Sequence, residues 1–553
     1  MRNWRLLLIV FFFLALGFGL TTRLAILQIA DHGFYRALAQ GQQSLPRIAV
    51  GNRGDIFFVD KKGTLYTVAT TKKQPFVFVT PVEVEQKEET AAILAAILDV
   101  QKDFVIEKLS KEESLFEVVK KQLSLEETYE LQKLVLPGVY IQQESIRSYP
   151  HGALASRTLG FVNQDWEGQY AIEKYYEEHL KGKEGLERTV RNVAGYLLSE
   201  NKDTLQHGKD LVLTIDFNIQ SMAESLLLKA KELHNIEEGT IIVIDPMDGS
   251  ILTLANYPNF DPNTYSEVAD FGVFQNPAVQ KLFEPGSVFK PITMASGIDA
   301  GKITPSTTYQ DQGVVRIGGY KVLNYDERVW GERTMTEVLE YSINTGAVFA
   351  EAETGHATFL EYLERFGIFK PTKVDIAGEI YSANKELKKG YEITYATASF
   401  GQGIEMTAMQ LLRAYSALAN GGYLPTPHLL KQDMPLSAPI ISERTASQVT
   451  AMLVSVTENG FAKSARVPGY YLAGKTGTAQ ISYSALGVEK PGYSDETVQS
   501  FIGYAPAFTP RFLALVTLKN PQTKTAEYSA IPLFQELAKY ILDYYEVPHD
   551  YGE

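Results

Sequence analysis

The segment FEPGSVFKPI, residues 283–292, decides how this chain folds around its chemistry. A Pro-Gly pair turns the chain directly before an apolar stretch with helical character. We therefore expect Ser287 at the N-terminus of a helix inside the protein, with Lys290 one turn later on the same face. Pro291 is tolerated there because the N–H groups of a first helical turn have no intrahelical partner. A serine is a weak nucleophile unless a base is near, and Lys290 stands where such a base is needed.

Two further motifs follow in order along the chain. SIN at residues 342–344 offers a second hydroxyl and an amide, and KTGT at residues 475–478 offers a cation and two hydroxyls on a strand-like run. With the first segment they supply a nucleophile, a base, a proton-relay serine and an anion-binding strand. These are the components of serine acyl transfer that proceeds without histidine.

Each motif alone has an ordinary explanation. Ser-x-x-Lys also occurs at Ser199/Lys202 and Ser382/Lys385, and residues 382–384 form a second Ser-x-Asn. Both copies lie in runs rich in charged residues and Asn, so we interpret them as solvated, exposed loops. The ordered trio favours function over the ordinary alternatives, which are a polar helix start for Ser342, a cap for Asn344 and an edge-strand lysine for Lys475.

Composition excludes several classes of function. The 553 residues allow more than one domain, and the 45% hydrophobic content supports folded cores. A formal net charge of −14 argues against nucleic acid as a partner. The chain has no cysteine, and its eight histidines show no ligand spacing and adjoin no motif. We therefore expect no disulfide, no metal site and no cofactor, and see no reason to propose a Ser-His-Asp triad.

The N-terminus carries the segment that is most apolar. Residues 6–22 are uncharged and flanked by Arg5 and Arg23, and at helical rise they span about 26 Å, enough for a bilayer core if the arginines snorkel. We expect a cytoplasmic stub at residues 1–5 and a transmembrane anchor at residues 6–28, with the remaining chain outside the cytoplasm. The alternative is a cleaved signal peptide, but the run is long for one and no clear A-x-A site follows.

The region from 31 to 225 reads as a non-catalytic domain. Residues 85–135 favour amphipathic helices, because Ile93, Leu94, Ile97 and Leu98 form an apolar stripe opposite Lys and Glu. The other expected elements are a helical continuation at 24–43, short strands within 46–81, short strands and turns over 138–215, and a helix at 219–233.

The region from 236 to 546 reads as a catalytic domain of the mixed α+β class. Strand-like runs at 240–244 and 251–255 are joined by a hairpin signal at 246–249. Residues 257–470 between them and the later strands favour mainly helix and loop. We expect one antiparallel five-stranded sheet covered by helices on both faces, with Ser287 between sheet and helices. The late elements are strands at 475–480, 501–504 and 512–518, and a closing amphipathic helix at 531–545.

With these residues in hand, the chain resembles the class B penicillin-binding proteins, the single-pass cell-wall D,D-transpeptidases of bacteria. The motif trio is the one known in penicillin-binding proteins and β-lactamases. The resemblance departs at residues 60–63, where DKKG stands for the usual Asp-x-Asn-Gly, and at Ala171, where Gly is common. Further segments that carry it are NRGDI at 52–56, RSYP at 147–150, residues 168–176, SFGQG at 399–403 and FIGYAP at 501–506.

The resemblance implies a fold, a reaction and partners. The fold is a transmembrane helix, an elongated pedestal of the dimerisation type and a transpeptidase domain. The substrate is a peptidoglycan stem peptide ending in D-Ala-D-Ala, β-lactams are trapped as esters, and a polytopic glycosyltransferase of the SEDS type is the expected membrane partner. Ser500-Phe501 favours a role in cell division.

The resemblance also implies the role of each site residue. Ser287 attacks the penultimate D-Ala carbonyl, and Lys290 takes its proton. For Lys290 to be neutral, burial, the helix N-terminus and the cation at Lys475 must lower its pKa. Ser342 relays a proton to the leaving amine. The remaining expected roles are substrate-amide binding by Asn344, carboxylate binding by Lys475 with Thr476, Gly477 and Thr478, and an oxyanion hole from the backbone N–H groups of Ser287 and Thr478.

Two other functions remain open on these residues. A carboxypeptidase or β-lactamase would use water in place of the acceptor amine, although a β-lactamase needs a deacylating base for which no motif is evident. A non-enzymatic β-lactam sensor or scaffold would retain the motifs, although a sensor would need an intracellular output domain and five residues precede the expected anchor.

Overall fold

The computed structural model describes residues 4–26, 44–111, 113–134, 136–191, 197–200, 206–432 and 438–552. The chain divides into two compact units. The first comprises Met1–Gly54 with His179–Lys209, and the second comprises Asp55–Glu178 with Asp210–Glu553. The second unit holds both the pedestal sheet and the catalytic sheet.

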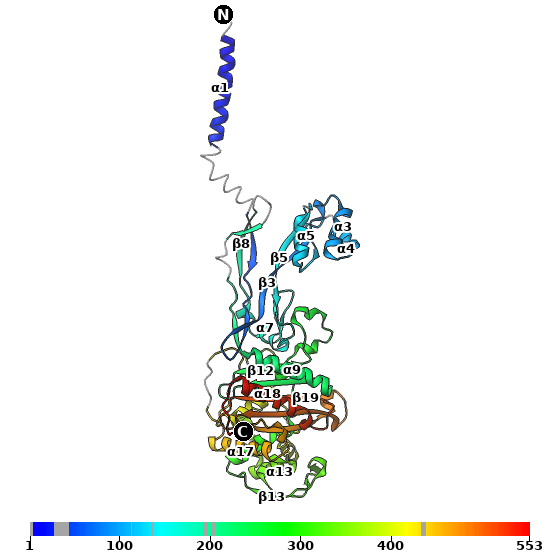
Figure 1. Cartoon of the computed structure of the whole chain (residues 1–553), viewed down its shortest axis with the longest axis vertical. Helices are drawn as coiled ribbons and strands as arrows, with labels where there is room; N and C mark the ends of the chain where they lie inside the picture. The colour runs from blue at the N-terminus through cyan, green and yellow to red at the C-terminus, as the bar shows by residue number, and fades with distance from the viewer. Residues whose placement is uncertain are drawn as a thin grey trace. The chain divides into compact units, whose positions relative to one another are not determined.

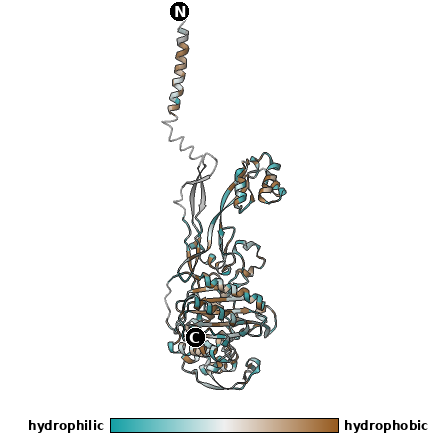
Figure 2. Cartoon of the chain, viewed as in Figure 1, coloured by the Kyte–Doolittle hydropathy of each residue, from teal (hydrophilic) through white to brown (hydrophobic). Residues whose placement is uncertain are grey.

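The first unit contains the apolar helix and a small sheet. Helix α1 (Trp4–Ala25) has 22 residues, and its window Leu8–Ala25 has a mean hydropathy of 2.0 with no side chain buried. Figure 2 shows this helix as largely apolar. A helix of this length and composition fits a single-pass membrane anchor. The predicted helical continuation at 24–43 falls mostly on residues 27–43, which lie outside the described part of the chain.

The sheet of the first unit corrects one expectation. It runs β1 (Ser44–Val50), β8 (Glu184–Arg191), β9 (Leu197–Glu200), with antiparallel neighbours. Ser199 lies on β9, so this copy of Ser-x-x-Lys begins on a strand and not in a loop. Its Lys202 lies outside the described residues.

The pedestal sheet is organised by one long strand. Strand β3 (Leu65–Val79) has 15 residues, longer than the short runs that the sequence predicts. Its first part pairs with β2 (Ile56–Val59), and its second part pairs with both β4 (Glu117–Lys120) and β5 (Val139–Ser148). Strand β10 (Leu211–Asp216) completes the sheet beside β2 in parallel.

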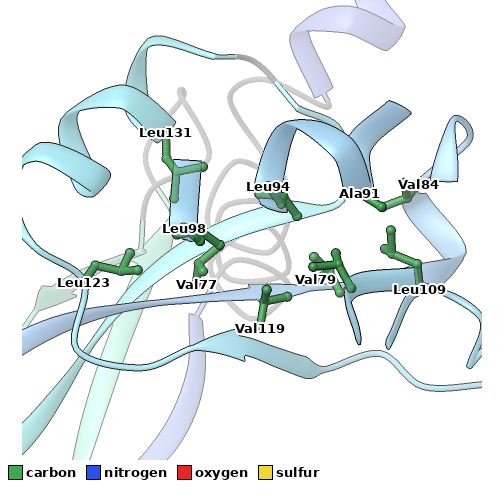
Figure 3. Close-up of a cluster of buried hydrophobic side chains, with 11 residues drawn as sticks. Val77, Val79, Val84, Ala91, Leu94, Leu98, Leu109, Val119, Leu123 and Leu131 are labelled. Carbon is green, nitrogen blue, oxygen red and sulfur yellow. The ribbon is translucent and has the colours of Figure 1, made fainter. Parts of the chain in front are cut away.

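A helical lobe packs on the distal half of β3. The predicted apolar stripe is confirmed where Leu94 and Leu98 are fully buried against Val77 and Val79 of the sheet (Figure 3). Strand β4 was not predicted inside 85–135, because two valines between Lys and Glu give no alternating run. The lobe helices are α3 (Lys87–Leu98), α4 (Lys102–Leu109) and α5 (Leu125–Lys133), the last of which starts with a capping box at Ser124.

A buried ion pair lies at the base of the pedestal. Arg147 Nε donates to Glu173 Oε1 at 2.8 Å, and Tyr149 donates its hydroxyl to the same carboxylate at 3.1 Å. Buried Arg157 donates to the carbonyls of Gln275 at 2.6 Å and Pro258 at 2.9 Å, which ties this base to the catalytic domain. Three short helices replace some of the predicted strands here: α6 (Ser156–Leu159), α7 (Ala171–Tyr175) and α8 (Glu177–Leu180). Between them lie two paired strands of two residues each, β6 (Phe161–Val162) and β7 (Gly168–Gln169).

The catalytic sheet has the five predicted strands in one antiparallel sheet. The long strand β18 begins eight residues before its predicted start. The prediction missed residues 493–500 because they are mostly polar and carry no apolar run. Strand β17 lies at the sheet edge. The order across the sheet is β12 (Ile251–Tyr257), β11 (Glu238–Ile244), β19 (Phe512–Lys519), β18 (Tyr493–Ala505) and β17 (Ala473–Ser482).

Helices cover both faces of this sheet, as Figure 1 shows for α9 (Phe217–His234) and α18 on one side and α17 on the other. Strand β18 demonstrates the alternation: Phe501 packs on Phe534 of α18 (Ala530–Tyr544) with ring centroids 4.6 Å apart. Tyr504, three residues on, hydrogen-bonds Thr450 of α17 (Glu443–Glu458) at 2.8 Å. Successive side chains of a strand point to opposite faces, so the two helices lie on opposite sides.

The layer that covers the active-site face contains hairpins as well as helices. The sequence predicts mainly helix and loop for 257–470, and the structure adds four strands of four residues each. They are too short to produce a readable alternation. They are β13 (Thr308–Asp311), β14 (Val314–Ile317), β15 (Tyr320–Leu323) and β16 (Gly331–Thr334).

The helical elements not yet placed belong mostly to this layer and its connections. They are α9 (Phe217–His234), α10 (Pro277–Gln280), α11 (Lys290–Asp299), α12 (Met335–Glu340), α13 (Asn344–Thr354), α14 (His356–Arg365), α15 (Glu392–Ala398), α16 (Ala408–Ala419), and the 3₁₀ turns η2 (Pro81–Glu83), η3 (Pro262–Glu267), η4 (Phe271–Phe274), η5 (Gly286–Phe289), η6 (Tyr325–Glu327), η7 (Leu387–Lys389), η8 (Lys463–Ala465), η9 (Ser484–Leu486) and η10 (Ala526–Tyr528).

Candidate active site

Ser287 lies in the single turn η5, which leads directly into α11. Lys290 is the first residue of α11 and is completely buried, whereas Ser287 is half-buried. Pro291 follows at a position where a helix lacks intrahelical N–H partners. The serine therefore stands at a helix start with the lysine amine beneath it.

Close backbone packing holds η5 against the sheet. Gly286 donates its N–H to the carbonyl of Gly401 at 2.9 Å. Gly401 has a φ of +81°, and a Cβ on it would lie 2.2 Å from the Gly286 oxygen. On the sheet side, a Cβ on Gly477 would lie 3.0 Å from Val288 Cγ1. Ser287 is therefore positioned by a backbone contact that a side chain at Gly401 would block and by close packing of Val288 on Gly477.

The amine of Lys290 joins three segments of the chain. Its Nζ lies 3.1 Å from Ser287 Oγ, 2.5 Å from the Ser342 carbonyl oxygen, 3.2 Å from Ser342 Oγ and 2.8 Å from Asn344 Oδ1. Burial lowers the pKa of Lys290 far below its ordinary value, and the positive charge of Lys475 lowers it further. A neutral amine 3.1 Å from a serine hydroxyl can accept the hydroxyl proton.

Ser342 connects the two buried lysines. Its hydroxyl oxygen lies 3.1 Å from Lys475 Nζ as well as near Lys290. Ser342 has a φ of +55°, an uncommon conformation for serine that costs on the order of 1 kcal/mol. The bond from Lys290 to the Ser342 carbonyl helps hold this turn between α12 and α13. This backbone conformation places the Ser342 hydroxyl between the amines of Lys290 and Lys475.

Lys475 is fully buried on the edge strand β17. It also donates to the Thr476 carbonyl at 3.1 Å, and burial lowers its pKa to about 7. An anion bound beside it would raise that pKa again. The hydroxyl of Thr478 accepts the Ala526 N–H at 3.3 Å, which uses an oxygen lone pair and leaves the hydroxyl proton available to donate.

Asn344 opens helix α13 and faces two ways. Its Oδ1 accepts from Lys290, and its Nδ2 donates to the carbonyl of Leu323 on β15 at 2.9 Å. The structure thus joins Ser287, Lys290, Ser342, Asn344 and Lys475 in one hydrogen-bonded cluster, with Thr476, Gly477 and Thr478 on the adjoining strand. Within the residues that the structure describes, no group of three or more His, Asp or Glu could hold a metal ion.

The second Ser-x-Asn differs from the exposed loop that we predicted. Asn384 is buried, its Nδ2 donates to the Glu405 carbonyl at 2.9 Å, and its Oδ1 accepts the Glu405 N–H at 2.8 Å. Ser382 is half-buried. This copy joins the loop at 382–385 to the loop that carries Glu405, and its hydrogen bonds are not shared with the cluster around Lys290.

Sequence reasoning missed supporting residues around η5. Tyr415 of α16 donates its hydroxyl to the Val288 carbonyl at 2.5 Å. Thr293 of α11 donates to the Ser399 carbonyl at 2.7 Å, so the SFGQG segment braces both η5 and α11. That segment was noted in the sequence, but only its contacts reveal what it does. Tyr415 carries no sequence signal at all.

Two family profiles match the chain. Residues 239–541 match the penicillin binding protein transpeptidase domain, and residues 48–213 match the penicillin-binding protein dimerisation domain. The chain belongs to the penicillin-binding transpeptidase family. It is therefore an enzyme of this serine-type class, whose members bind stem peptides and β-lactams.

Relatives and solved structures agree with this assignment. Stage V sporulation protein D of Bacillus subtilis is 30% identical over 537 residues, covering 94% of this chain and 82% of the relative. The probable peptidoglycan D,D-transpeptidase PenA of Neisseria gonorrhoeae is 31% identical over 504 residues, covering 90% and 84%. The crystal structure of penicillin binding protein 2X from Streptococcus thermophilus shares the fold, with a TM-score of 0.74 at 22% identity over 91% of this chain and 81% of that one.

Gly401→Ala should displace η5 and slow acylation of this penicillin-binding transpeptidase by penicillin at least tenfold, about 1.4 kcal/mol. The new Cβ would meet backbone atoms of Gly286, which cannot rotate away. The matched control is Gly487→Ala, where φ is +72° and no atom lies within 4 Å of the added Cβ. Both variants carry the strain of a positive φ, so equal acylation rates in the two would contradict the positioning role.

Proposed function

We propose that this transpeptidase cross-links peptidoglycan stem peptides ending in D-Ala-D-Ala, with Ser287 as its nucleophile. One observation carries the proposal: the chain of contacts from Ser287 Oγ to Lys290 Nζ to Ser342 Oγ to Lys475 Nζ, with successive separations of 3.1, 3.2 and 3.1 Å. Such a chain can remove a proton from one oxygen and deliver it to a nitrogen on the same substrate.

Acylation begins with a neutral Lys290. The Ser287 hydroxyl gives its proton to Lys290 while the oxygen attacks the carbonyl carbon of the penultimate D-Ala. The backbone N–H groups of Ser287 and Thr478 are the proposed donors to the oxyanion that forms. Asn344 is the proposed partner of the substrate amide.

Collapse of this intermediate expels the terminal D-Ala. Ser342 passes its proton to the departing amine and is reprotonated by Lys290, so both lysines and the serine return to their starting states. The charged Lys475, with the hydroxyls of Thr476 and Thr478, holds the terminal carboxylate. β-Lactams present a similar carboxylate and carbonyl, and the same steps would leave them esterified to Ser287.

The second half of the reaction transfers the acyl group to an amine. The C–N bond to the acceptor forms, the ester bond to Ser287 breaks, and the amine proton returns to the Ser287 oxygen through the same groups. By resemblance, the Ser500-Phe501 pair favours a role in cell division, which depletion would reveal as filamentous cells.

The proposed organisation assigns a place in the envelope to each part. Residues 1–5 form a cytoplasmic stub, 6–28 the anchor, 31–225 the pedestal and 236–546 the transpeptidase domain. Support comes from the Arg-flanked apolar helix and from the matched profiles. A polytopic glycosyltransferase of the SEDS type is the proposed partner of the anchor and pedestal, since the sequence analysis assigns no catalytic role to these parts.

Protease added outside intact cells freed of their wall should digest all but a small N-terminal fragment. The expected orientation follows from the basic residues before the apolar helix.

Exchange of Leu6–Leu27 for an unrelated transmembrane helix should keep this orientation and weaken co-purification of the glycosyltransferase. If the glycosyltransferase still co-purifies equally after both this exchange and mutation of the pedestal, the proposed partner is refuted. A soluble mature form without residues 1–30 would refute the membrane anchor.

Labelled penicillin should attach covalently to Ser287 and to no other residue of the purified protein. Ser287 is the serine of the Ser-x-x-Lys motif that leads into α11, and its oxygen lies 3.1 Å from the buried amine of Lys290. Peptide mapping by mass spectrometry locates the label, and Ser287→Ala should abolish it. Ser382→Ala is the matched control from the other Ser-x-x-Lys copy in this unit. A label on Ser199 or Ser382 would refute the assignment.

Lys290→Arg should slow acylation by roughly 10²–10⁴-fold, because arginine keeps the charge but cannot act as a base near neutrality. Lys475→Arg should be milder, since arginine keeps the positive charge that binds the carboxylate. The measurement is the second-order rate of acylation by benzylpenicillin across pH.

The same lysines set the pH profile. The rate should rise with pH as Lys290 loses its proton, through a pKa well below that of free lysine, because burial and Lys475 lower it. The rate should fall again around the Lys475 pKa of about 7, as that charge is lost on raising pH. Lys475→Arg should remove the falling limb. A larger loss in Lys475→Arg than in Lys290→Arg would overturn this division of roles.

A further inference from the structure

Three aromatic rings gather beside Ser342, on segments outside the motif trio. We call Trp330, Tyr341 and Phe461 the aromatic cluster. Trp330 stacks on Tyr341 with ring centroids 4.8 Å apart and an interplanar angle of 14°, and Phe461 lies 5.8 Å from Tyr341 and 6.3 Å from Trp330. Phe461 is 39% exposed, and the other two rings are half-buried. The cluster therefore keeps part of its ring surface exposed, and its Tyr341 directly precedes Ser342 in the chain.

The cluster is held in place by backbone bonds. The Phe461 N–H donates to the Glu340 carbonyl at 3.1 Å, next to Tyr341 and Ser342 in the chain. The Trp330 N–H donates to Asp311 Oδ2 at 2.8 Å. The guanidinium of Arg333 lies over both Trp330 and Tyr341, at 6.0 and 5.8 Å from their centroids. A rigid aromatic surface binds with little loss of conformational entropy.

The position of the cluster along β17 identifies the substrate that it faces. Thr457 Oγ1 donates to the Leu472 carbonyl at 2.6 Å, which joins the end of α17, four residues before Phe461, to the start of β17. Ser287 lies further along, where Gly286 meets Ala479. The cluster thus lies at the Lys475 end of the strand, where the proposed mechanism binds the terminal D-Ala carboxylate.

Transfer to an amine retraces the departure of D-Ala. The leaving nitrogen departs on the side of Ser342 and Lys475, so an acceptor nitrogen must attack the ester from that side and use the same proton relay. The rest of the acceptor then extends away from Ser287, beyond the Lys475 end. Tyr341 directly precedes Ser342, whose hydroxyl oxygen lies 3.1 Å from Lys475 Nζ.

We propose that the aromatic cluster binds the acceptor stem peptide and thereby selects an extended peptide amine over a small amine or water. This inference rests on the proposed transpeptidase function and adds to it a site for the second substrate. The chemical class is a peptide whose primary amine reaches the ester while its aliphatic and amide groups lie on the rings. Aromatic side chains give such surfaces much of their binding energy.

The test is a competition between acceptors of two lengths. A labelled pentapeptide ending in D-Ala-D-Ala serves as donor. The acceptors are D-alanine carrying a second isotope label, so that its product differs in mass from the donor, and a tripeptide with a blocked N-terminus and a free lysine side-chain amine. The D-alanine is too short to reach the rings. In Trp330→Ala and Phe461→Ala, the ratio of tripeptide product to D-alanine product should fall about tenfold. The matched control is Phe271→Ala, an exposed aromatic on η4, which should keep the wild-type ratio.

The possible outcomes distinguish a failure of the acceptor-binding inference from a failure of the proposed transpeptidase function. Acylation by benzylpenicillin, measured in parallel, shows whether each variant is folded. Equal losses with both acceptors would mean that the rings only support Ser342, and an unchanged ratio would mean that they do not bind acceptor; either result overturns the inference. A wild type that uses the tripeptide no better than D-alanine overturns it too. A wild type that never forms the acyl-enzyme refutes the proposed function instead.

Discussion

The amine of one fully buried lysine, Lys290, is the constraint around which this active site is built. An isolated charge in that position would carry a large desolvation cost, so the fold must either neutralise the amine or surround it with acceptors. It does both: four oxygens from three residues lie within 3.2 Å, and burial beside Lys475 favours the neutral form. The reactivity of Ser287 therefore depends on how completely the surrounding layers exclude water.

Water is excluded by the close backbone packing of the segments around Ser287. Turn η5 lies between the edge strand β17 and the loop of Gly401. A Cβ at position 401 would block this approach, and glycine at 477 lets Val288 pack closely on β17. Interiors packed in this way respond to small volume changes, because neighbouring atoms cannot relax independently. Residues remote from the chemistry, such as Tyr415 beneath Val288, thus share in the placement of the nucleophile.

The sequence predicted whatever rests on local pattern. Four of the five strands of the catalytic sheet carry apolar runs, β17 carries the KTGT motif, and the order of the motif trio indicated which residues would meet. Elements of two to five residues, such as β4, β13 and α7, escaped because they are too short for a period to register. Tyr415 and the aromatic cluster escaped for another reason: their partners lie far away in the chain, and contact between such segments exists only after folding. The first part of β18 was not predicted because its residues are polar, although they belong to the strand in the structure.

Strand β17 is an edge strand within the described sheet, and it carries KTGT. An edge presents backbone N–H and C=O groups in a fixed repeat to any extended chain that lies alongside. A substrate paired there is recognised by its main chain, as an added strand of the sheet. Side-chain changes on β17 can alter such pairing only by moving the strand, and moving it also disturbs the buried amines. Substitutions on β17 therefore affect the pairing of a substrate and the environment of Lys475 together.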